Sequence, residues 1–254
     1  MITRRTLLTT GAVAAGAAVI LPYAAMAEQH MADSYETAEG SVTIHPISHA
    51  SFVMETPLGI IYNDPVGDPA LYADYPEPAL ILITHEHGDH YNVETLNAVV
   101  GPNTQLITNP AVFEMLPDGL KARATSMANG DTTNVLGLEI EAIPAYNTTE
   151  ERKQYHPEGR DNGYLLGFDG LRVYIAGDTE DTPEMRAMTD IDVAFVPMNL
   201  PYTMTIEQAA AGVEAFAPKF VYPYHYRDSD AEAFAELVRQ SDAATEVKMG
   251  PWYN

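Results

Sequence analysis

A short apolar segment that leads directly into a histidine-rich motif constrains this chain more than any other feature. Residues 79–84, with the sequence ALILIT, follow two closely spaced prolines, and their branched side chains predict a buried strand. Four side chains that can bind a metal follow immediately: His85, His87, Asp89 and His90. Imidazole together with carboxylate suits zinc, manganese or iron. The sequence therefore predicts a metal site at the end of a buried strand.

The spacing of these side chains predicts two neighbouring groups of ligands. His85 and His87 are separated by one residue, so on an extended backbone they point the same way. Gly88 is expected to let the chain turn sharply, which would aim Asp89 and His90 at a second point nearby. Two such groups suit a pair of adjacent metals. A merely solvated polar loop, the alternative interpretation, accounts for a single histidine better than for the full HxHxDH pattern.

The composition limits both the ligands and the partners of this site. The chain has 254 residues, 46% of them hydrophobic, which predicts one sizeable domain with its own core. Its formal charge of −23 would repel a phosphate backbone, so nucleic acid is not expected as a partner. The chain contains no cysteine, so a metal site must be built from His, Asp, Glu and water.

Residues 1–27 predict an export signal that is not part of the fold. Arg4 and Arg5 precede an uncharged segment, residues 6–27, that is rich in Ala and Gly. This pattern is typical of a twin-arginine signal, and residues 25–27, AMA, fit its cleavage site. We expect the twin-arginine export machinery to deliver a periplasmic domain, residues 28–254, with no stable membrane insertion. A membrane anchor is the alternative interpretation, because the apolar run is nearly long enough to span a bilayer.

Apolar runs predict many short strands with a few helices. The expected strands cover residues 41–48, 51–56, 60–63, 79–84, 104–108, 132–136, 138–145, 163–168, 171–176, 193–198, 220–224 and 245–249. The expected helices cover residues 93–100, 111–116, 205–216 and 229–240. Residues 28–40 are expected to form a loose leader, and residues 68–78 an irregular loop. The polar segment 147–162 is long for a connection, so a lid or binding loop and a merely solvated loop are both open.

Two later strands also end on side chains that can bind a metal. Asp178 follows the strand 171–176 in a Gly-Asp-Thr turn, and His225 follows the strand 220–224. Alone, each would be interpreted as an ordinary turn or structural residue. In this order after an HxHxDH motif, both are expected to join the metal site.

The order of these motifs resembles the metallo-β-lactamase superfamily. HEHGDH at 85–90 and AGDT at 176–179 carry the resemblance most specifically. Further motifs, which together span most of residues 28–254, are similar to the ascorbate-phosphate-lactonase-like branch of that superfamily: HAS at 49–51, NDP at 63–65, IPAYN at 143–147, HPEG at 156–159 and PYHY at 223–226. The resemblance implies an α+β fold, an αββα four-layer sandwich, that carries a dinuclear metal centre.

Carried over by position, the resemblance also assigns the ligands of two metals. The first metal would be held by His85 and His87, the second by Asp89, His90 and His225, and the two would be bridged by Asp178.

The chain departs from the family pattern at one ligand of the first metal. Many relatives have a histidine where this chain has Tyr146-Asn147, so the first metal lacks a nitrogen ligand. His156 is the only histidine between the HEHGDH motif and Asp178, and it is our candidate for that ligand. Without it, the first site would be weak or empty. His30 and His45 match no motif and are expected to be ordinary histidines.

Two divalent metal ions would enable this centre to catalyse hydrolysis. Zinc is expected foremost, with manganese or iron as alternatives. A hydroxide shared by two metals roughly 3.5–4 Å apart forms near neutral pH and can attack a carbonyl or phosphoryl centre. Asp178 would orient the hydroxide and accept its proton, and Asp178 and Asp89 are the expected catalytic residues. The resemblance alone favours a small-molecule substrate that is a carboxylic ester or lactone. A phosphodiester or phosphoester is the alternative.

Two other classes of function stay open. A non-catalytic metal-binding protein would use the same ligands without turnover. A metal-dependent oxidoreductase could share the fold, but the diiron redox relatives typically have Glu where this chain has His87. Neither the substrate nor the oligomeric state follows from the sequence.

Overall fold

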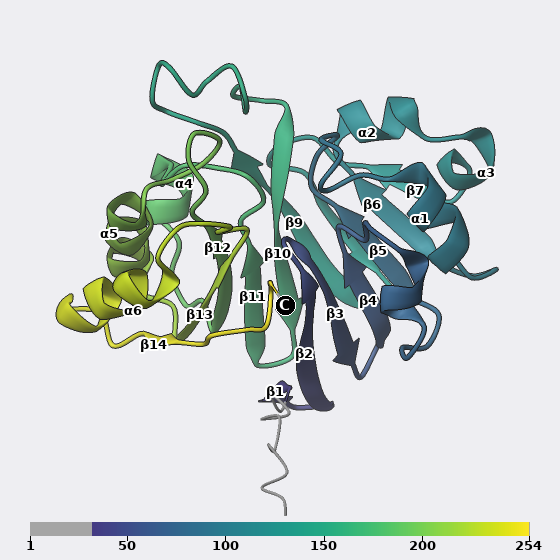
Figure 1. Ribbon diagram of the computed structural model, residues 1–254. Helices are drawn as coiled ribbons and strands as arrows, with labels where there is room; N and C mark the ends of the chain where they lie inside the picture. Colours follow the sequence, from purple (N-terminus) through teal and green to yellow (C-terminus); the bar gives the residue numbers. More distant parts are fainter. Residues whose placement is uncertain (1–31, 254) are drawn as a thin grey trace, which may run out of the picture.

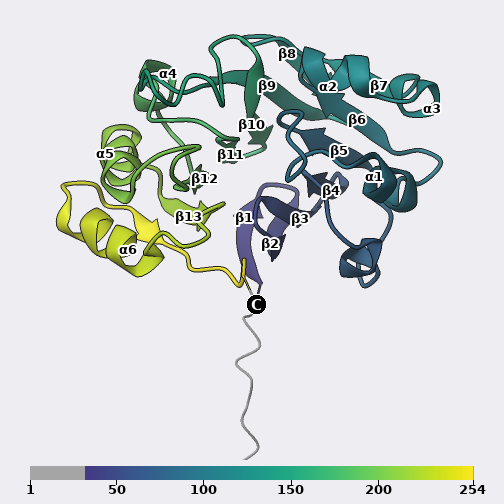
Figure 2. The ribbon, with the colours of Figure 1, turned by 45° about the horizontal axis from the view of Figure 1, so that its top comes forward.

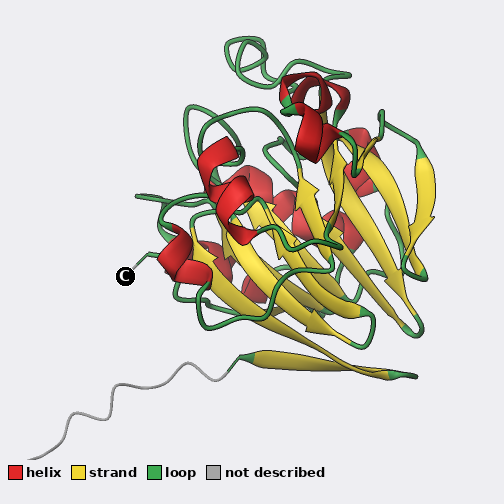
Figure 3. Ribbon diagram, turned by 90° about the vertical axis from the view of Figure 1, so that its right-hand side faces the viewer, coloured by secondary structure: helices red, strands yellow, loops and turns green. Residues whose placement is uncertain are grey.

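Two mixed β-sheets pack face to face, and helices cover the outer side of each sheet, in the computed structural model, which describes residues 32–253 (Figure 1). Most strands of the two sheets run in similar directions through the molecule (Figure 3). The αββα sandwich expected from the motif resemblance is therefore confirmed.

In the described part of the chain, residues 32–253, each sheet has seven strands whose spatial order follows the chain. The first sheet consists of β1 (Asp33–Thr37), β2 (Gly40–Ser48), β3 (Ser51–Thr56), β4 (Gly59–Asn63), β5 (Leu80–Ile83), β6 (Gln105–Thr108) and β7 (Ala124–Ser126). The second sheet consists of β8 (Thr132–Val135), β9 (Leu138–Ala145), β10 (Asp161–Phe168), β11 (Leu171–Ile175), β12 (Val193–Pro197), β13 (Phe220–Tyr224) and β14 (Glu246–Val247). In each sheet the first four strands pair antiparallel and the last four pair parallel.

The helices lie in the connections between parallel strands, because a parallel pair needs a long crossover connection, which usually contains a helix. The first sheet is covered by α1 (Val93–Val99), α2 (Pro110–Met115) and α3 (Asp118–Lys121), and a short 3₁₀ helix, η1 (Pro69–Tyr72), precedes β5. The second sheet is covered by α4 (Pro183–Arg186), α5 (Ile206–Phe216) and α6 (Ala231–Gln240). Figure 2 shows these two sets of helices on opposite sides of the paired sheets.

The central parallel strands are apolar on both faces because each face lies against a different layer. In β5, Leu80 and Leu82 pack between the two sheets, whereas Ile81 and Ile83 pack against the helices. In β12, Phe195 lies between the sheets and stacks on Phe52 at a ring-centroid distance of 4.1 Å. This alternation explains why these strands are continuous apolar runs in the sequence.

Local sequence signals set several connections as expected. The dipeptide Asp169-Gly170 turns β10 into β11, with Phe168 opposite Leu171. Thr205 caps α5 in a capping box with Gln208.

The loose leader expected over residues 28–40 is wrong for its described part. β1 pairs antiparallel with β2, and Tyr35 is buried in the core between the sheets. The Tyr35 hydroxyl lies 2.7 Å from the Tyr222 hydroxyl of the second sheet. A polar strand held by one aromatic anchor has little hydrophobic pattern, so local sequence does not reveal it.

Other differences from the expected elements lie mainly at boundaries. β10 begins at Asp161, inside the expected polar loop, and the last strand shrinks to Glu246–Val247. The short elements β7, α3, α4 and η1 were not expected at all. They are only three or four residues long, too short for a hydrophobic period to be read.

The predicted export signal and His30 lie outside the described residues. Within residues 32–253, every helix is too short or too polar to cross a membrane.

Candidate metal centre

The metal-type side chains predicted from the sequence gather at the carboxyl ends of parallel strands, where open α/β sheets commonly carry their sites. The HEHGDH residues follow β5 of the first sheet. Asp178 follows β11 and His225 follows β13, both in the second sheet. The centre therefore spans the junction of the two sheets.

The first group of candidate ligands consists of His85, His87 and His156, whose ligand atoms all lie within 4.8 Å of one another. His85 Nε2 lies 3.1 Å from His87 Nδ1. His156 is fully buried although it belongs to the long β9–β10 connection. The structure thus brings His156 to the position of the missing nitrogen ligand; metal binding by it stays a prediction.

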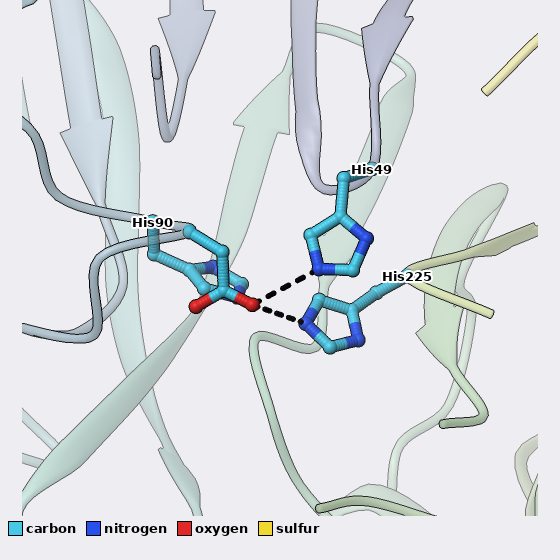
Figure 4. A group of neighbouring side chains, drawn as sticks. His49, His90 and His225 are labelled. Carbon is cyan, nitrogen blue, oxygen red and sulfur yellow. Dashed lines mark hydrogen bonds and ion pairs between the residues drawn. The ribbon is translucent and has the colours of Figure 1, made fainter. Parts of the chain in front are cut away.

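The second group consists of Asp89, His90 and His225, together with His49, again within 4.8 Å. Figure 4 shows His49 and His225 directed at the same carboxylate oxygen, with His90 beside them. This oxygen is Asp89 Oδ2, which lies 3.1 Å from His49 Nε2 and 3.4 Å from His225 Nε2.

Asp178 lies between the two groups. Its Oδ2 is 3.4 Å from His156 Nε2 and 3.9 Å from His85 Nε2, on the side of the first group. The same oxygen is 3.3 Å from His225 Nε2, and Oδ1 is 3.3 Å from His90 Nε2, on the side of the second. This is the geometry that a bridging carboxylate needs.

The donor atoms of the centre fit bound metal. His90 Nε2, His156 Nε2, His225 Nε2 and Asp178 Oδ1 are buried and make no hydrogen bond to any described residue. Buried polar atoms are normally hydrogen-bonded, and leaving one unsatisfied costs roughly 1–3 kcal/mol. Four such atoms, gathered around Asp178 between the two ligand groups, indicate cation ligands.

Buried carboxylates fix the orientation of two histidines through their other ring nitrogen. Asp64 Oδ2 lies 2.9 Å from His90 Nδ1, and Asp161 Oδ2 lies 2.9 Å from His156 Nδ1. Arg160 donates two hydrogen bonds to Asp161, of 2.7 and 2.8 Å. Such partners leave Nε2 facing the site and make it a stronger ligand.

Burial and neighbouring charges set the protonation of the cluster. Burial disfavours a charged His90, but Asp178 and Asp64 outweigh it and raise the pKa of His90 well above its usual range. Burial, followed by the neighbouring His90, lowers the pKa of His85 well below its usual value. Burial opposes ionisation of Asp178, yet His225 and His90 hold the pKa of this carboxyl well below its usual range. An ionised Asp178 therefore lies beside a His90 that favours its charged form and a His85 that favours its neutral form.

The glycine of the HEHGDH motif has a smaller role than expected. Gly88 does not have a positive φ, and a Cβ there would meet no atom within 4 Å. The sharp turn instead uses hydrogen bonds from the His90 and Tyr91 N–H groups to the His87 carbonyl. Gly177 is the constrained glycine: its φ is +66°, and a Cβ would lie 2.6 Å from the Asn162 carbonyl oxygen.

Asn147 is used to hold the β9–β10 connection. Its Nδ2 donates to the Arg152 carbonyl at 3.0 Å and to the Tyr202 carbonyl at 2.7 Å. Buried Glu180 accepts hydrogen bonds from the Thr148 and Thr149 N–H groups and pairs with Arg152 at 2.6 Å. The connection is anchored against the site, which favours a binding loop over a merely solvated one.

A pocket of about 590 Å³ opens onto the centre. Its wall includes His87, Asp89, His156, Asp178 and His225 from the two ligand groups. The remaining wall is formed by Tyr155, Asn199, Leu200, Pro201, Tyr202, Arg227 and Asp228. The volume is that of a small-molecule site. Two other surface hollows, lined mainly by residues of β8–β11, include no residue of either ligand group.

Sequence reasoning assigned no role to His49, Asp64 or Asp161. His49 is buried, its φ is +56°, and its carbonyl accepts a hydrogen bond from the His225 N–H. Its Nδ1 lies 2.6 Å from the Tyr253 hydroxyl. The HAS and NDP motifs marked the positions of His49 and Asp64 without a function, and nothing local marks Asp161. His45, by contrast, pairs with Glu55 outside the cluster, as an ordinary histidine would.

Comparison with protein families agrees with this arrangement. Residues 43–225 match the family model described as "Beta-lactamase superfamily domain". A UPF0173 metal-dependent hydrolase of Pyrococcus furiosus is 31% identical over 219 residues, which cover 80% of this chain and 95% of that protein. Another, of Methanopyrus kandleri, is 31% identical over 217 residues, covering 79% and 93%.

Solved structures give the same picture. A crystal structure from Parabacteroides distasonis, described as a candidate metal-dependent hydrolase, has 43% sequence identity and a TM-score of 0.80, and covers 87% of this chain and 99% of that one. The metallo hydrolase Igni18 of Ignicoccus hospitalis has 24% identity and a TM-score of 0.68 over 82% of this chain and 94% of that one, a likeness of fold.

Proposed function

The chain belongs to the metallo-β-lactamase superfamily and, within it, to the UPF0173 metal-dependent hydrolase family, and on this basis we propose that it hydrolyses a carboxylic ester or lactone with two divalent metal ions. It is a metal-dependent hydrolase. We propose three things beyond this: the ester or lactone substrate class, the number of metal ions, which is two, and their identity, which is zinc foremost. The observation that carries it is Asp178, which lies within 3.9 Å of histidines from both ligand groups.

The residues would divide into two ligand sets. His85, His87 and His156 would hold one metal, Asp89, His90 and His225 the other, and Asp178 both. When bound, the two ions supply Lewis acidity toward a carbonyl oxygen and lower the pKa of water toward neutrality.

Asp178 is the proposed proton acceptor and Asp89 the proposed orienting carboxylate. Asp178 is buried and ionised, and its Oδ1 makes no hydrogen bond to a described residue. Because Asp178 lines the pocket, this free oxygen is the atom to which we assign the uptake of a proton released there. His225 and His49, with burial opposing them, hold the pKa of Asp89 below its usual range, so Asp89 also stays ionised at neutral pH.

The pocket wall supports a small organic substrate. Tyr155, Leu200, Pro201 and Tyr202 form the aromatic and apolar part of the pocket wall. Such a wall suits a carbon skeleton, and the convergent polar groups suit its reacting carbonyl. The preference for lactones rests on the motif resemblance to the ascorbate-phosphate-lactonase-like branch, because the relatives are named for metal-dependent hydrolysis and not for a substrate.

Metal content and a substrate panel test this proposal together. We expect about two metals per chain and metal-dependent turnover of esters or lactones above phosphodiesters. His156→Ala should lose metal and turnover together, and excess metal should restore part of both. His45→Ala, which removes a histidine outside the cluster, is the matched control and should keep both. Turnover confined to phosphoesters, or one metal at saturation with full activity, would contradict the proposal.

We also propose that the protein is exported as a periplasmic enzyme through its Arg4-Arg5 signal. The support is the residue pattern of the first 27 positions, which no described residue tests.

A further inference from the structure

One basic side chain of the protein differs from all the others. Within residues 32–253, each other lysine and arginine side chain has a hydrogen bond or ion pair with another protein group, such as Lys153 with Glu150 or Arg186 with Asp181. The Arg227 guanidinium has none among the described residues. The Arg227 side chain is exposed, so the absence of a partner among the described residues leaves it accessible to a ligand from solution.

Arg227 also lies in a special place. It lines the pocket that opens onto the metal centre, two residues after His225. Both residues have left-handed backbone conformations, with φ of +49° at His225 and +42° at Arg227. Non-glycine residues adopt this conformation at some energetic cost, so the turn that carries Arg227 to the pocket is a specified feature.

Among the described residues that line the pocket, Arg227 is the one cationic side chain besides the histidines. Asp89 and Asp178 belong to the ligand groups, and the aromatic and apolar wall is uncharged. Asp228 follows Arg227 and also lines the pocket, so it would partly offset the positive charge. An anion approaching this acidic protein is repelled at long range, and a local guanidinium is what would retain it.

We propose that Arg227 binds an oxyanion, a carboxylate or phosphate, carried by the substrate at a distance from the bond that is hydrolysed. The guanidinium presents paired N–H donors that match the two oxygens of such a group. This inference rests on the proposed hydrolase function and narrows it to anionic esters or lactones. Arg227 is thereby a specificity-determining residue.

Matched esters test the proposal with the metal-loaded protein. The probes are the 4-nitrophenyl monoester of adipic acid, its neutral methyl diester, and a 4-nitrophenyl ester that carries a phosphate. For the wild type we expect a higher kcat/KM for an anionic ester than for the neutral one. Arg227→Gln should reduce that preference by roughly tenfold to a hundredfold, the range of a hydrogen bond to a charged group. The two anionic esters distinguish carboxylate from phosphate.

Two control variants bracket the result. Lys153→Gln removes one positive charge from the β9–β10 connection, where Lys153 pairs with Glu150 and does not line the pocket, and should leave the preference unchanged. Asp228→Asn removes the opposing charge and should raise the preference. An unchanged preference in Arg227→Gln, or an equal loss with Lys153→Gln, would overturn the proposal.

Binding measured by calorimetry separates this inference from the hydrolase proposal. If no ester is turned over, the hydrolase proposal fails, and adipate and methyl phosphate can still be titrated into wild type and Arg227→Gln. Tighter binding of either anion to the wild type, by about tenfold, supports the anion site. Equal affinities, or no binding to the wild type, reject it.

Discussion

Replacing Asp178 by Asn should remove turnover far more than it removes folding. The two side chains have nearly the same shape, but Asn is neutral and cannot take up a proton. Asp178 contacts both ligand groups, with oxygens 3.3 Å from His90 Nε2 and 3.3 Å from His225 Nε2. A single substitution therefore removes the shared negative charge from both halves of the centre at once.

The size of the effect follows from the two roles of that carboxylate. Loss of one preorganised electrostatic contact typically costs about 10²–10³ in turnover. Loss of a positioned proton acceptor costs about 10²–10⁴. Because one group performs both roles, the losses overlap, and we expect kcat to fall by roughly a thousandfold or more, about 4 kcal/mol in activation free energy.

The assay compares kcat, metal content and the thermal midpoint of unfolding for wild type and Asp178→Asn, at saturating metal. Turnover should collapse while the protein remains folded with its sheets intact. Metal content should also fall, because the bridging charge is gone. A fully active Asp178→Asn protein with normal metal content would refute the mechanism proposed above.

Two further predictions follow from individual contacts, and a third follows from the sequence of the first 27 residues. Gly88→Ala should change the free energy of unfolding by less than about 1 kcal/mol, because a Cβ there meets no other atom. Gly177→Ala should lower the free energy of unfolding by about 2–5 kcal/mol, because of its left-handed φ and its contact with the Asn162 carbonyl. Equal denaturation midpoints for the two variants would contradict this. Asp161→Asn should weaken metal binding at His156 by roughly tenfold to a hundredfold, because Asp161 orients the His156 ring. Competition with a chromophoric chelator measures the metal affinity. An unchanged affinity would mean that the Asp161–His156 hydrogen bond has a structural role only. The mass of protein recovered from the periplasm should correspond to a chain that begins at Glu28, and an intact N-terminus would reject the export signal.

The sheets and the motif-bearing strand ends could be predicted because their signals are local. The double-sided apolar run of β5, the Asp169-Gly170 turn and the capping box at Thr205 each act within a few residues. His156 could be proposed by elimination, since few histidines were available. β1 could not be predicted, because it depends on Tyr35 reaching Tyr222, 187 residues away.

The surroundings of the centre escaped prediction for the same reason. His49 is linked to Tyr253, 204 residues away, and to Asp89, 40 residues away. Such pairs leave no periodicity in the sequence. The prediction for Gly88 was wrong for a different reason. A glycine in the motif suggested a backbone conformation that only glycine adopts easily, but the backbone at Gly88 has no positive φ.

The distribution of the candidate ligands between the sheets has a consequence for assembly. The HEHGDH residues and His49 belong to the half of the chain that forms the first sheet, whereas His156, Asp178 and His225 belong to the half that forms the second. Neither half alone contains a complete set of ligands for either metal. A metal bound between His90 and His225 would act as a reversible cross-link that closes a loop of more than a hundred residues, and it would favour docking of the halves over their separation. Chelation should therefore weaken the contact between the two sheets, and fragments divided between β7 and β8 should reassociate through the shared apolar core more tightly when metal is supplied.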